Sequence, residues 1–359
     1  MSAAGKSSPI KKSVRYILDG LSMPVFVVDP KENLRFINKA ASKRYSSAKE
    51  GKAFAKVINE EECLKAMRKI LKGAPNGTAM VTLQEVVPTN FRVSLSRLDA
   101  EKSQNDPSCV LCFEDISHIQ EAEQMRHDFV ANVSHELRSP LTALTGFIET
   151  LQGPASDDAN ARHRFLEMMA KESNRMARLV ADLLSLSKLQ ASERMAPEQT
   201  TDLFNVLNRV FSSLGGLADK GGIKIVLDLK GEMPLVIGDS DELTQVFQNL
   251  VENAIKYSPE GSEVHVSLCD PKKSKKKKRK HLCICVVDSG DGIDPIHIPR
   301  LTERFYRVDK GRSRMKGGTG LGLAIVKHIL IRHRGWLTID SEPGKGSRFS
   351  VYLPIARQK

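Results

Sequence analysis

The spacing of hydrophobic residues divides the chain into three regions. Between Ile17 and Ile116, short apolar runs alternate with polar turns. This pattern predicts one helix and several strands: Glu61–Leu71 for the helix, and Val25–Asp29, Arg35–Asn38, Val81–Val87, Phe91–Leu98 and Cys109–Glu114 for the strands. The first region, residues 13–116, is therefore expected to be a small α+β domain with an antiparallel sheet.

From Ser117 to about Ala191 the hydrophobic period becomes helical. Met125, Phe129, Val133, Leu137 and Leu141 recur every four residues. After a break at Gly153–Asp158, a second helix carries Met169, Met176 and Leu183 at intervals of seven, with Leu179 and Leu186 between them. Residues 117–192 are thus expected to form a helical hairpin with a coiled-coil-like seam. Each helix would expose an apolar stripe, so we expect two copies to pair in a dimeric four-helix bundle.

After Thr201, helices and strands alternate again. The pattern predicts helices over Asp241–Tyr257 and Gly320–Arg334, and strands over Glu263–Cys269, Leu282–Asp288, Leu337–Asp340 and Ser347–Leu353. Residues 198–357 are therefore expected to form an α/β sandwich. The fold class of the whole chain is multidomain α+β.

The net charge of +12 is concentrated in one place. Eight basic residues lie within Lys272–Lys280, and the rest of the chain has 47 basic against 43 acidic residues. The run contains no aromatic residue to stack on bases. We therefore expect no stable nucleic-acid binding, and at most a weak contact of this loop with anionic surfaces. With no transmembrane-length apolar stretch and a polar start, a cytoplasmic location is expected.

The six cysteines do not form a disulfide pattern. Cys109 and Cys112 would face opposite sides of a strand. Cys283 and Cys285 would share a face, but no further pair at zinc spacing accompanies them. We interpret the cysteines as small hydrophobic residues in strands.

The first long helix carries a candidate nucleophile. His135 lies off the apolar stripe and is followed by Glu136, whose carboxylate can hold one ring nitrogen protonated and make the other more nucleophilic. Ser139 is one turn further on the same face. Pro140 cannot donate to the carbonyl of residue 136, so a bend is expected there.

Four patches in the third region together describe a nucleotide pocket. One helix face carries Asn249, Asn253 and either Lys256 or Tyr257. The amide oxygens of the two asparagines suit Mg²⁺, and the lysine suits phosphate. Asp288 ends a strand and can accept a hydrogen bond from an adenine amine, and Gly290 and Gly292 let a base approach the backbone. Arg304–Val308 is aromatic and basic. The last patch opens a helix and offers amides to phosphate; its residues are Gly317, Gly318, Thr319, Gly320, Leu321 and Gly322.

With these motifs, the sequence resembles the sensor histidine kinases of bacterial two-component systems. The segment Ser134–Leu141 resembles their phosphoacceptor box, and the four patches resemble the N, G1, F and G2 boxes of the Bergerat-type ATP-binding domain shared with gyrase and Hsp90. The segments Gly146–Asp158 and Leu183–Leu189 most resemble the phosphate-regulon sensor kinases. The region before His135 resembles a PAS sensor domain.

The resemblance implies roles for individual residues. His135 would be phosphorylated from ATP, Glu136 would be its acid/base partner, and Ser139 would orient water for dephosphorylation of a response regulator. Asn253 would hold Mg²⁺, beside Asn249 and Lys256. Asp288 would bind adenine, Arg307 would meet the terminal phosphate, and Asp309–Lys316 would form a lid. The phosphoryl group would then pass to an aspartate of the regulator, in a system of phosphate-responsive type.

Two other functions fit parts of the sequence. A gyrase- or Hsp90-like ATPase would share the pocket, but it needs a glutamate to activate water where this chain has Asn249. A binding module would use the lysine run as an anchor for nucleic acid or acidic lipid, and salt-dependent binding would identify it.

Overall fold

The computed structural model describes residues 12–83, 88–98, 108–155, 157–193, 195–229, 233–269, 280–309 and 318–356. The chain divides into two compact units, Met1–Asp128 and Phe129–Lys359. Among the described helices, none is long and apolar enough to cross a membrane.

The first unit contains a five-stranded antiparallel sheet in the order β2-β1-β5-β4-β3. The strands are β1 (Val25–Val28), β2 (Leu34–Ile37), β3 (Asn76–Leu83), β4 (Thr89–Leu98) and β5 (Ser108–Asp115). The helices are α1 (Lys12–Asp19), α2 (Lys39–Arg44) and α3 (Glu61–Leu71), with a 3₁₀ turn η1 (Phe54–Lys56). The predicted α+β unit with an antiparallel sheet is confirmed, and the predicted bounds of α3 are those observed.

The core of this unit is aromatic and apolar. Phe26 contacts the rings of Phe54 and Phe113 edge-on, with centroids 5.7 and 5.4 Å apart. The buried Asn38 side chain caps α2 by accepting from the Ala41 amide, and it also accepts from Val25 N and donates to two backbone carbonyls. All its hydrogen-bonding capacity is used, so its burial carries little cost.

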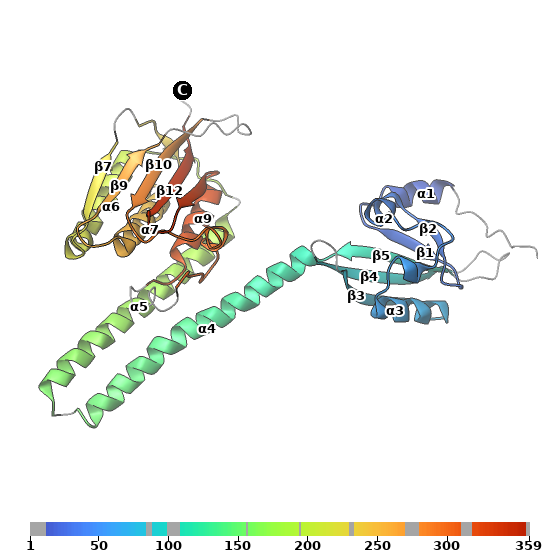
Figure 1. Ribbon diagram of the computed structural model, residues 1–359, viewed down its shortest axis with the longest axis horizontal. Coiled ribbons are helices and arrows are strands. Elements are labelled where there is room, and N and C mark those ends of the chain that lie inside the picture. The colour runs from blue at the N-terminus through green and yellow to red at the C-terminus, as the bar shows by residue number, and fades with distance from the viewer. Residues whose placement is uncertain are drawn as a thin grey trace, which may run out of the picture. The chain divides into compact units, whose positions relative to one another are not determined.

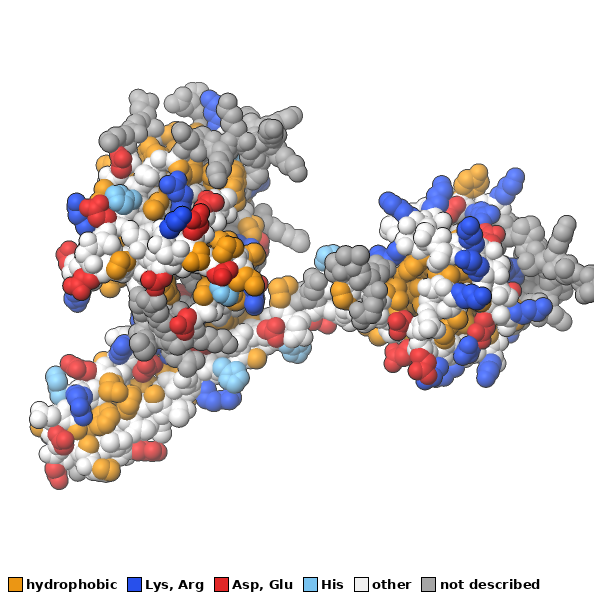
Figure 2. Space-filling model, in the orientation of Figure 1, with side chains coloured by type: hydrophobic (Ala, Val, Ile, Leu, Met, Phe, Trp, Pro, Cys, Tyr) orange, Lys and Arg blue, Asp and Glu red, His pale blue; other side chains and the backbone are white. Residues whose placement is uncertain are grey.

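Two long helices form the predicted hairpin: α4 (Ser117–Gln152) and α5 (Ala159–Ser192). Helix α4 is continuous through Pro140, and Asp158 caps α5 by accepting from the amides of Asn160 and Ala161. Hydrophobic side chains gather on the surface of the hairpin (Figure 2). Leu141 of α4 and Leu166 of α5 are 56% and 52% exposed. A single chain therefore leaves apolar stripes of the hairpin uncovered.

The rest of the second unit is an α/β sandwich. Its main sheet has the order β11-β12-β10-β9-β7, in which only the β7–β9 pair is parallel. The strands are β7 (Lys224–Asp228), β9 (Glu263–Leu268), β10 (His281–Asp288), β11 (Trp336–Ser341) and β12 (Ser347–Pro354); the short β6 (Thr200–Thr201) and β8 (Val236–Ile237) pair separately. The helices α6 (Leu203–Lys220), α7 (Ser240–Tyr257) and α9 (Gly322–Arg332) cover one face of the main sheet (Figure 1), and a 3₁₀ turn η2 spans Ile298–Arg300.

The core of the sandwich extends into the hairpin. Leu179, Leu186 and Leu189 of α5 are buried in the same cluster as Ile325 and Ile329 of α9. The sequence pattern assigned Leu179 and Leu186 to the hairpin seam alone, whereas both pack against the α/β sandwich.

Some expectations concern residues outside those described. These are Gly317, residues 310–316 of the expected lid, residues 272–279 of the lysine run, and the end of the strand expected over Val81–Val87.

Candidate active site

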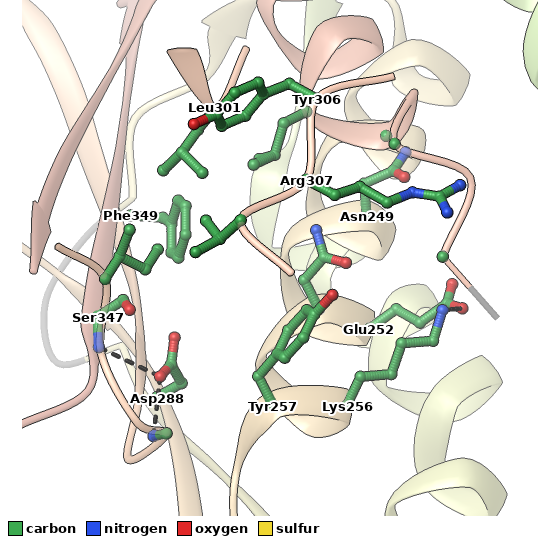
Figure 3. Close-up of a pocket in the computed structure, with 18 of the residues that line it drawn as sticks. Asn249, Glu252, Lys256, Tyr257, Asp288, Leu301, Tyr306, Arg307, Ser347 and Phe349 are labelled. Carbon is green, nitrogen blue, oxygen red and sulfur yellow. Dashed lines mark hydrogen bonds and ion pairs between the residues drawn. The ribbon is translucent and has the colours of Figure 1, made fainter. Parts of the chain in front are cut away.

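A pocket of about 320 Å³ lies between α7, the end of β10, the segment Leu301–Asp309 and the start of α9 (Figure 3). This volume is in the range of small-molecule sites. The pocket brings together twelve of the predicted nucleotide-binding residues, whereas Leu321 is buried in the core. Its predicted lining residues are Asn249, Asn253, Lys256, Tyr257, Asp288, Gly290, Gly292, Arg307, Gly318, Thr319, Gly320 and Gly322.

Helix α7 presents one face to the sheet and another to the pocket. Asp239 caps the helix by accepting from the amides of Asp241 and Glu242. One face buries Leu243, Val246, Phe247, Leu250 and Val251. The other face carries the predicted polar residues, and there Lys256 forms a 2.7 Å ion pair with Glu252. Helical periodicity therefore places the amides and the lysine together in the pocket.

Asp288 ends β10 and is buried at the base of the pocket. Its Oδ1 accepts hydrogen bonds from Gly290 N at 2.9 Å and Ser347 N at 3.1 Å. Burial raises the pKa of this carboxyl, against the opposing effect of the two backbone hydrogen bonds. The other carboxylate oxygen points into the pocket (Figure 3), where it can accept a hydrogen bond from an amine.

The start of α9 lies against Asn249. A Cβ on Gly322 would come within 2.5 Å of Asn249 Oδ1, so only glycine allows this approach. The Asn249 amide nitrogen donates to Gln245 O at 2.9 Å, which fixes the side chain. The N-cap residue, Leu321, makes no side-chain cap, so amides of the first turn are open to an anion.

Two lining residues come from the hairpin and were not predicted. Asp182 of α5 accepts a 2.8 Å hydrogen bond from the Thr319 hydroxyl, and Arg178 lies 4.0 Å from Glu252. Burial raises the pKa of Asp182, while the Thr319 hydrogen bond lowers it. In the sequence, Arg178 and Asp182 form an i, i+4 polar pair beside a buried stripe. This spacing can be found in the sequence, but the sequence does not show which part of the protein the two side chains contact.

The residues predicted on α4 lie outside the pocket lining. His135 and Ser139 are exposed. Glu136 Oε2 accepts from Arg175 at 2.6 Å and from Arg307 at 3.4 Å. Because Arg307 also lines the pocket, this carboxylate links the His135 segment to the pocket wall.

A second contact joins α4 to the same wall. The rings of Phe129 and Phe305 have centroids 5.9 Å apart, and the Arg304 guanidinium lies 5.2 Å from the centroid of the Phe129 ring. Burial lowers the pKa of Arg304. The aromatic and basic patch thus contacts α4, in addition to lining the pocket through Tyr306, Arg307 and Val308.

The charged residues of the pocket lining are net acidic. Three are basic (Arg178, Lys256, Arg307) and five are acidic (Asp182, Glu252, Asp288, Asp291, Asp309). A triphosphate would meet repulsion in such a pocket unless a cation accompanied it. The side-chain oxygens of Asn249 and Asn253 are hard ligands that suit Mg²⁺, so the residues present fit a metal–nucleotide complex.

Family models match two parts of the chain. Residues 125–192 match the His Kinase A (phospho-acceptor) domain, and residues 238–357 match the histidine kinase-, DNA gyrase B- and HSP90-like ATPase. These matches cover most of the hairpin and most of the α/β sandwich.

Several curated proteins are similar in sequence. The phosphate regulon sensor protein PhoR of Pseudomonas aeruginosa is 43% identical over 244 residues, which cover 68% of this chain and 53% of PhoR. The sensor-like histidine kinase SenX3 of Mycolicibacterium smegmatis is 40% identical over 245 residues, 68% of this chain and 62% of SenX3. The chain therefore spans little more than half the length of these two relatives.

Two further matches cover nearly the whole chain. The sensor protein kinase WalK of Staphylococcus aureus is 31% identical over 347 residues, which cover 96% of this chain and 81% of that protein. Among solved structures, histidine kinase ThkA in complex with response regulator protein TrrA has a TM-score of 0.52 at 20% identity, covering 95% of this chain and 98% of that one. The structural match indicates a shared fold.

Proposed function

The chain belongs to the sensor histidine kinases of two-component systems, and from this premise we propose that it phosphorylates His135 from Mg-ATP and passes the phosphoryl group to an aspartate of a response regulator. The observation that carries the proposal is a contact between the pocket wall and the residue next to His135. Arg307 lines the nucleotide pocket and also contacts Glu136, the neighbour of His135.

The proposed reaction needs little covalent chemistry from the protein. The lone pair of one His135 ring nitrogen attacks the γ-phosphorus, an N–P bond forms, and the bond to the ADP oxygen breaks. Glu136 would hold the proton on the other ring nitrogen. The exposure of His135 supports this role, because both the nucleotide and a regulator must reach it in turn.

The pocket residues would bind and orient ATP. Asp288 would accept from the adenine amine, and Lys256 and Arg307 would neutralise phosphate charge. Asn253 would hold Mg²⁺, with Asn249 beside the phosphates. When bound, the metal offsets the negative charge of the phosphates. The net acidic lining supports this need for a cation.

We also propose that the chain acts as a homodimer in the cytoplasm. The exposed apolar residues on α4 and α5, including Val130, Leu141 and Leu184, support pairing through the hairpin. A supply of ATP requires the cytoplasmic compartment. Ser139, one turn after His135, would orient water when the phosphorylated regulator is hydrolysed.

The proposal also includes the region that would receive the signal. Residues 13–116 would act as a PAS-like sensor unit. The 43% identity to the phosphate regulon sensor protein PhoR over 244 residues supports a phosphate-responsive system.

Autophosphorylation tests the proposal. We expect the purified chain with γ-labelled Mg-ATP to gain an acid-labile, base-stable label. His135→Gln should abolish the label and retain ATP binding. His127→Gln is the matched control, because His127 is also exposed on α4. A label that survives in His135→Gln would refute the assignment of the phosphoacceptor.

A further inference from the structure

Three cysteines meet on the sheet face that lies away from the nucleotide pocket. On β10, Ile284 and Val286 point into the main core, while Cys283 and Cys285 alternate with them and form a separate cluster with Tyr352. Cys269 follows β9, and its amide donates to Cys283 O at 3.0 Å. The sheet register therefore brings a third thiol, 14 residues earlier in the chain, beside the pair.

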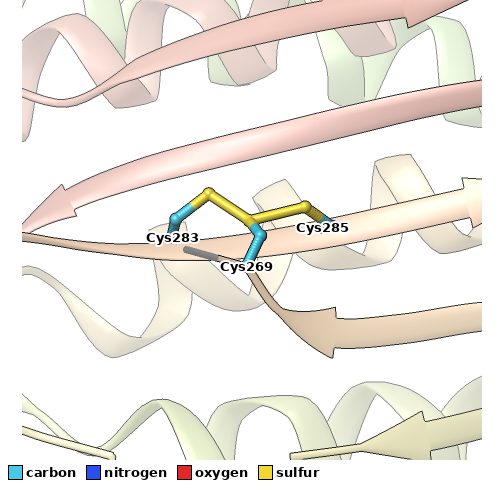
Figure 4. Close-up of side chains that lie close together, drawn as sticks. All are labelled: Cys269, Cys283 and Cys285. Atoms are coloured by element: carbon cyan, nitrogen blue, oxygen red, sulfur yellow. A yellow bond between two sulfur atoms is a disulfide. The ribbon is translucent and has the colours of Figure 1, made fainter. Parts of the chain in front are cut away.

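We propose that Cys269, Cys283 and Cys285 form a binding site for a thiophilic metal ion, with Zn²⁺ as the ion to test. Their three sulfur atoms lie within 4.8 Å of one another (Figure 4). A Zn–S bond of ~2.3 Å implies sulfur atoms roughly 3.8 Å apart in tetrahedral geometry. The three thiols are thus close enough to bind one ion together.

A disulfide bond would engage only two of the three cysteines. Cys269 lies within bonding reach of both Cys283 and Cys285, with Cα separations of 5.2 and 5.9 Å. A sulfur atom forms one disulfide bond, so the two pairings exclude each other and either leaves a thiol over. Under reducing conditions thiols stay unpaired, and a metal ion engages all three.

The surroundings favour a charged metal complex over free thiolates. Cys283 and Cys285 are buried, and Val287, Trp336 and Tyr352 pack against the cluster. Thiolates in such apolar surroundings are costly without a cation. Binding would release the thiol protons to solvent and supply that cation. Cys285 Sγ lies 3.4 Å from Ser350 Oγ, a hydroxyl that can donate to the metal-bound sulfur.

The chemistry of the cluster separates it from the nucleotide pocket. Three sulfur ligands select soft ions such as Zn²⁺ or Cu⁺ and discriminate against Mg²⁺. The fourth position would be left to water or a solute. Because Cys269 directly follows β9 and Cys283 lies on β10, a bound ion would cross-link the end of β9 to β10 and stabilise the sheet.

Metal titration of the full chain tests the proposal. The protein is prepared reduced and metal-free and titrated with Zn²⁺ against a chromophoric chelator in excess Mg²⁺. We expect one Zn²⁺ per chain and a raised Tm. Cys283→Ser should weaken Zn²⁺ binding by more than the ~10–100-fold that loss of an outer partner costs. Cys112→Ser, a partly exposed cysteine of the first unit, is the matched control and should bind normally.

A second measurement does not depend on the variants. Zn²⁺ should protect Cys269, Cys283 and Cys285 from alkylation and leave the other three of the six cysteines unchanged, as mapped by mass spectrometry. Failure to take up Zn²⁺, with all thiols reactive, would overturn the proposal. A disulfide from Cys269 that persists after reduction and refolding in reductant would overturn it as well.

Discussion

Gly322 offers a sharp test of how the pocket is built. A Cβ at this position would lie 2.5 Å from Asn249 Oδ1 and 3.4 Å from Asn249 Cγ. The backbone of a first helical turn accepts alanine, and Gly→Ala there favours the helix by about 0.5–1 kcal/mol. Gly322→Ala therefore sets a favourable local effect against an overlap with one side chain of the proposed ATP site.

The size of the overlap sets the expected effect. Asn249 must move by about 1 Å to restore normal contact, which strains its 2.9 Å hydrogen bond to Gln245 O. Overpacking of this kind costs about 1–3 kcal/mol. Because Asn249 is proposed to lie beside the phosphates, a cost borne by the bound state weakens ATP binding by roughly 5–150-fold.

Calorimetric titration with a non-hydrolysable ATP analogue and Mg²⁺ measures this change. Gly216→Ala is the matched control, because it also lies in a helix and a Cβ there has no atom within 4 Å. The control should bind normally and show a slightly higher Tm. Equal affinities in the two variants would refute the argument that the approach of Gly322 to Asn249 shapes the nucleotide site.

Three further changes probe titratable groups. Burial raises the Asp288 pKa, so ATP affinity should fall on acidification with a midpoint above the ordinary ~3.9, and Asp288→Asn should weaken adenine binding and remove that midpoint from the titration. The buried His333 pairs Nδ1 with Ile329 O and accepts from Asp239 N through Nε2. Its pKa is lowered by burial, so its stabilisation is complete above the unfolded value of ~6.5 and is lost as pH falls toward the folded value. His333→Leu should cost about 1–3 kcal/mol in denaturant unfolding at pH 8 and flatten that pH dependence; an unchanged slope would contradict the assignment. Asp182→Asn removes an acidic group from the pocket and should tighten ATP binding severalfold by titration, and weaker binding would contradict the electrostatic argument.

Much of the nucleotide site could be predicted because its residues recur at local spacings. The period of α7 alone places Asn249, Asn253 and Lys256 on one face, and the predicted helix Asp241–Tyr257 differs from the observed one by a single residue. Asp288 was predicted to end a strand, as it does. That four patches distant in sequence converge on one pocket was predicted from their shared nucleotide-binding chemistry and from the family resemblance, since no spacing links residue 249 to residue 322.

What could not be predicted depends on packing between elements. Leu179 and Leu186 have the seven-residue spacing of a coiled-coil seam, and the same spacing also suits burial against α9, as observed. Because α5 packs against the sandwich in this way, its polar residues Arg178 and Asp182 reach the pocket. The cysteine cluster required the register of β9 on β10, because Cys269 is far from Cys283 in sequence and a one-residue slip would move it to the other face.

The contribution of α5 to the pocket implies that nucleotide binding and hairpin contact are linked. Asp182 accepts from Thr319 at the position where phosphates would approach the start of α9. The Asp182 carboxylate and a triphosphate cannot both occupy this region favourably, because like charges repel. ATP should therefore weaken the contact between α5 and the Thr319 loop, and that contact must weaken ATP binding by the same factor. Through this coupling, nucleotide binding would change the contacts of α5, which pairs with the helix that carries His135.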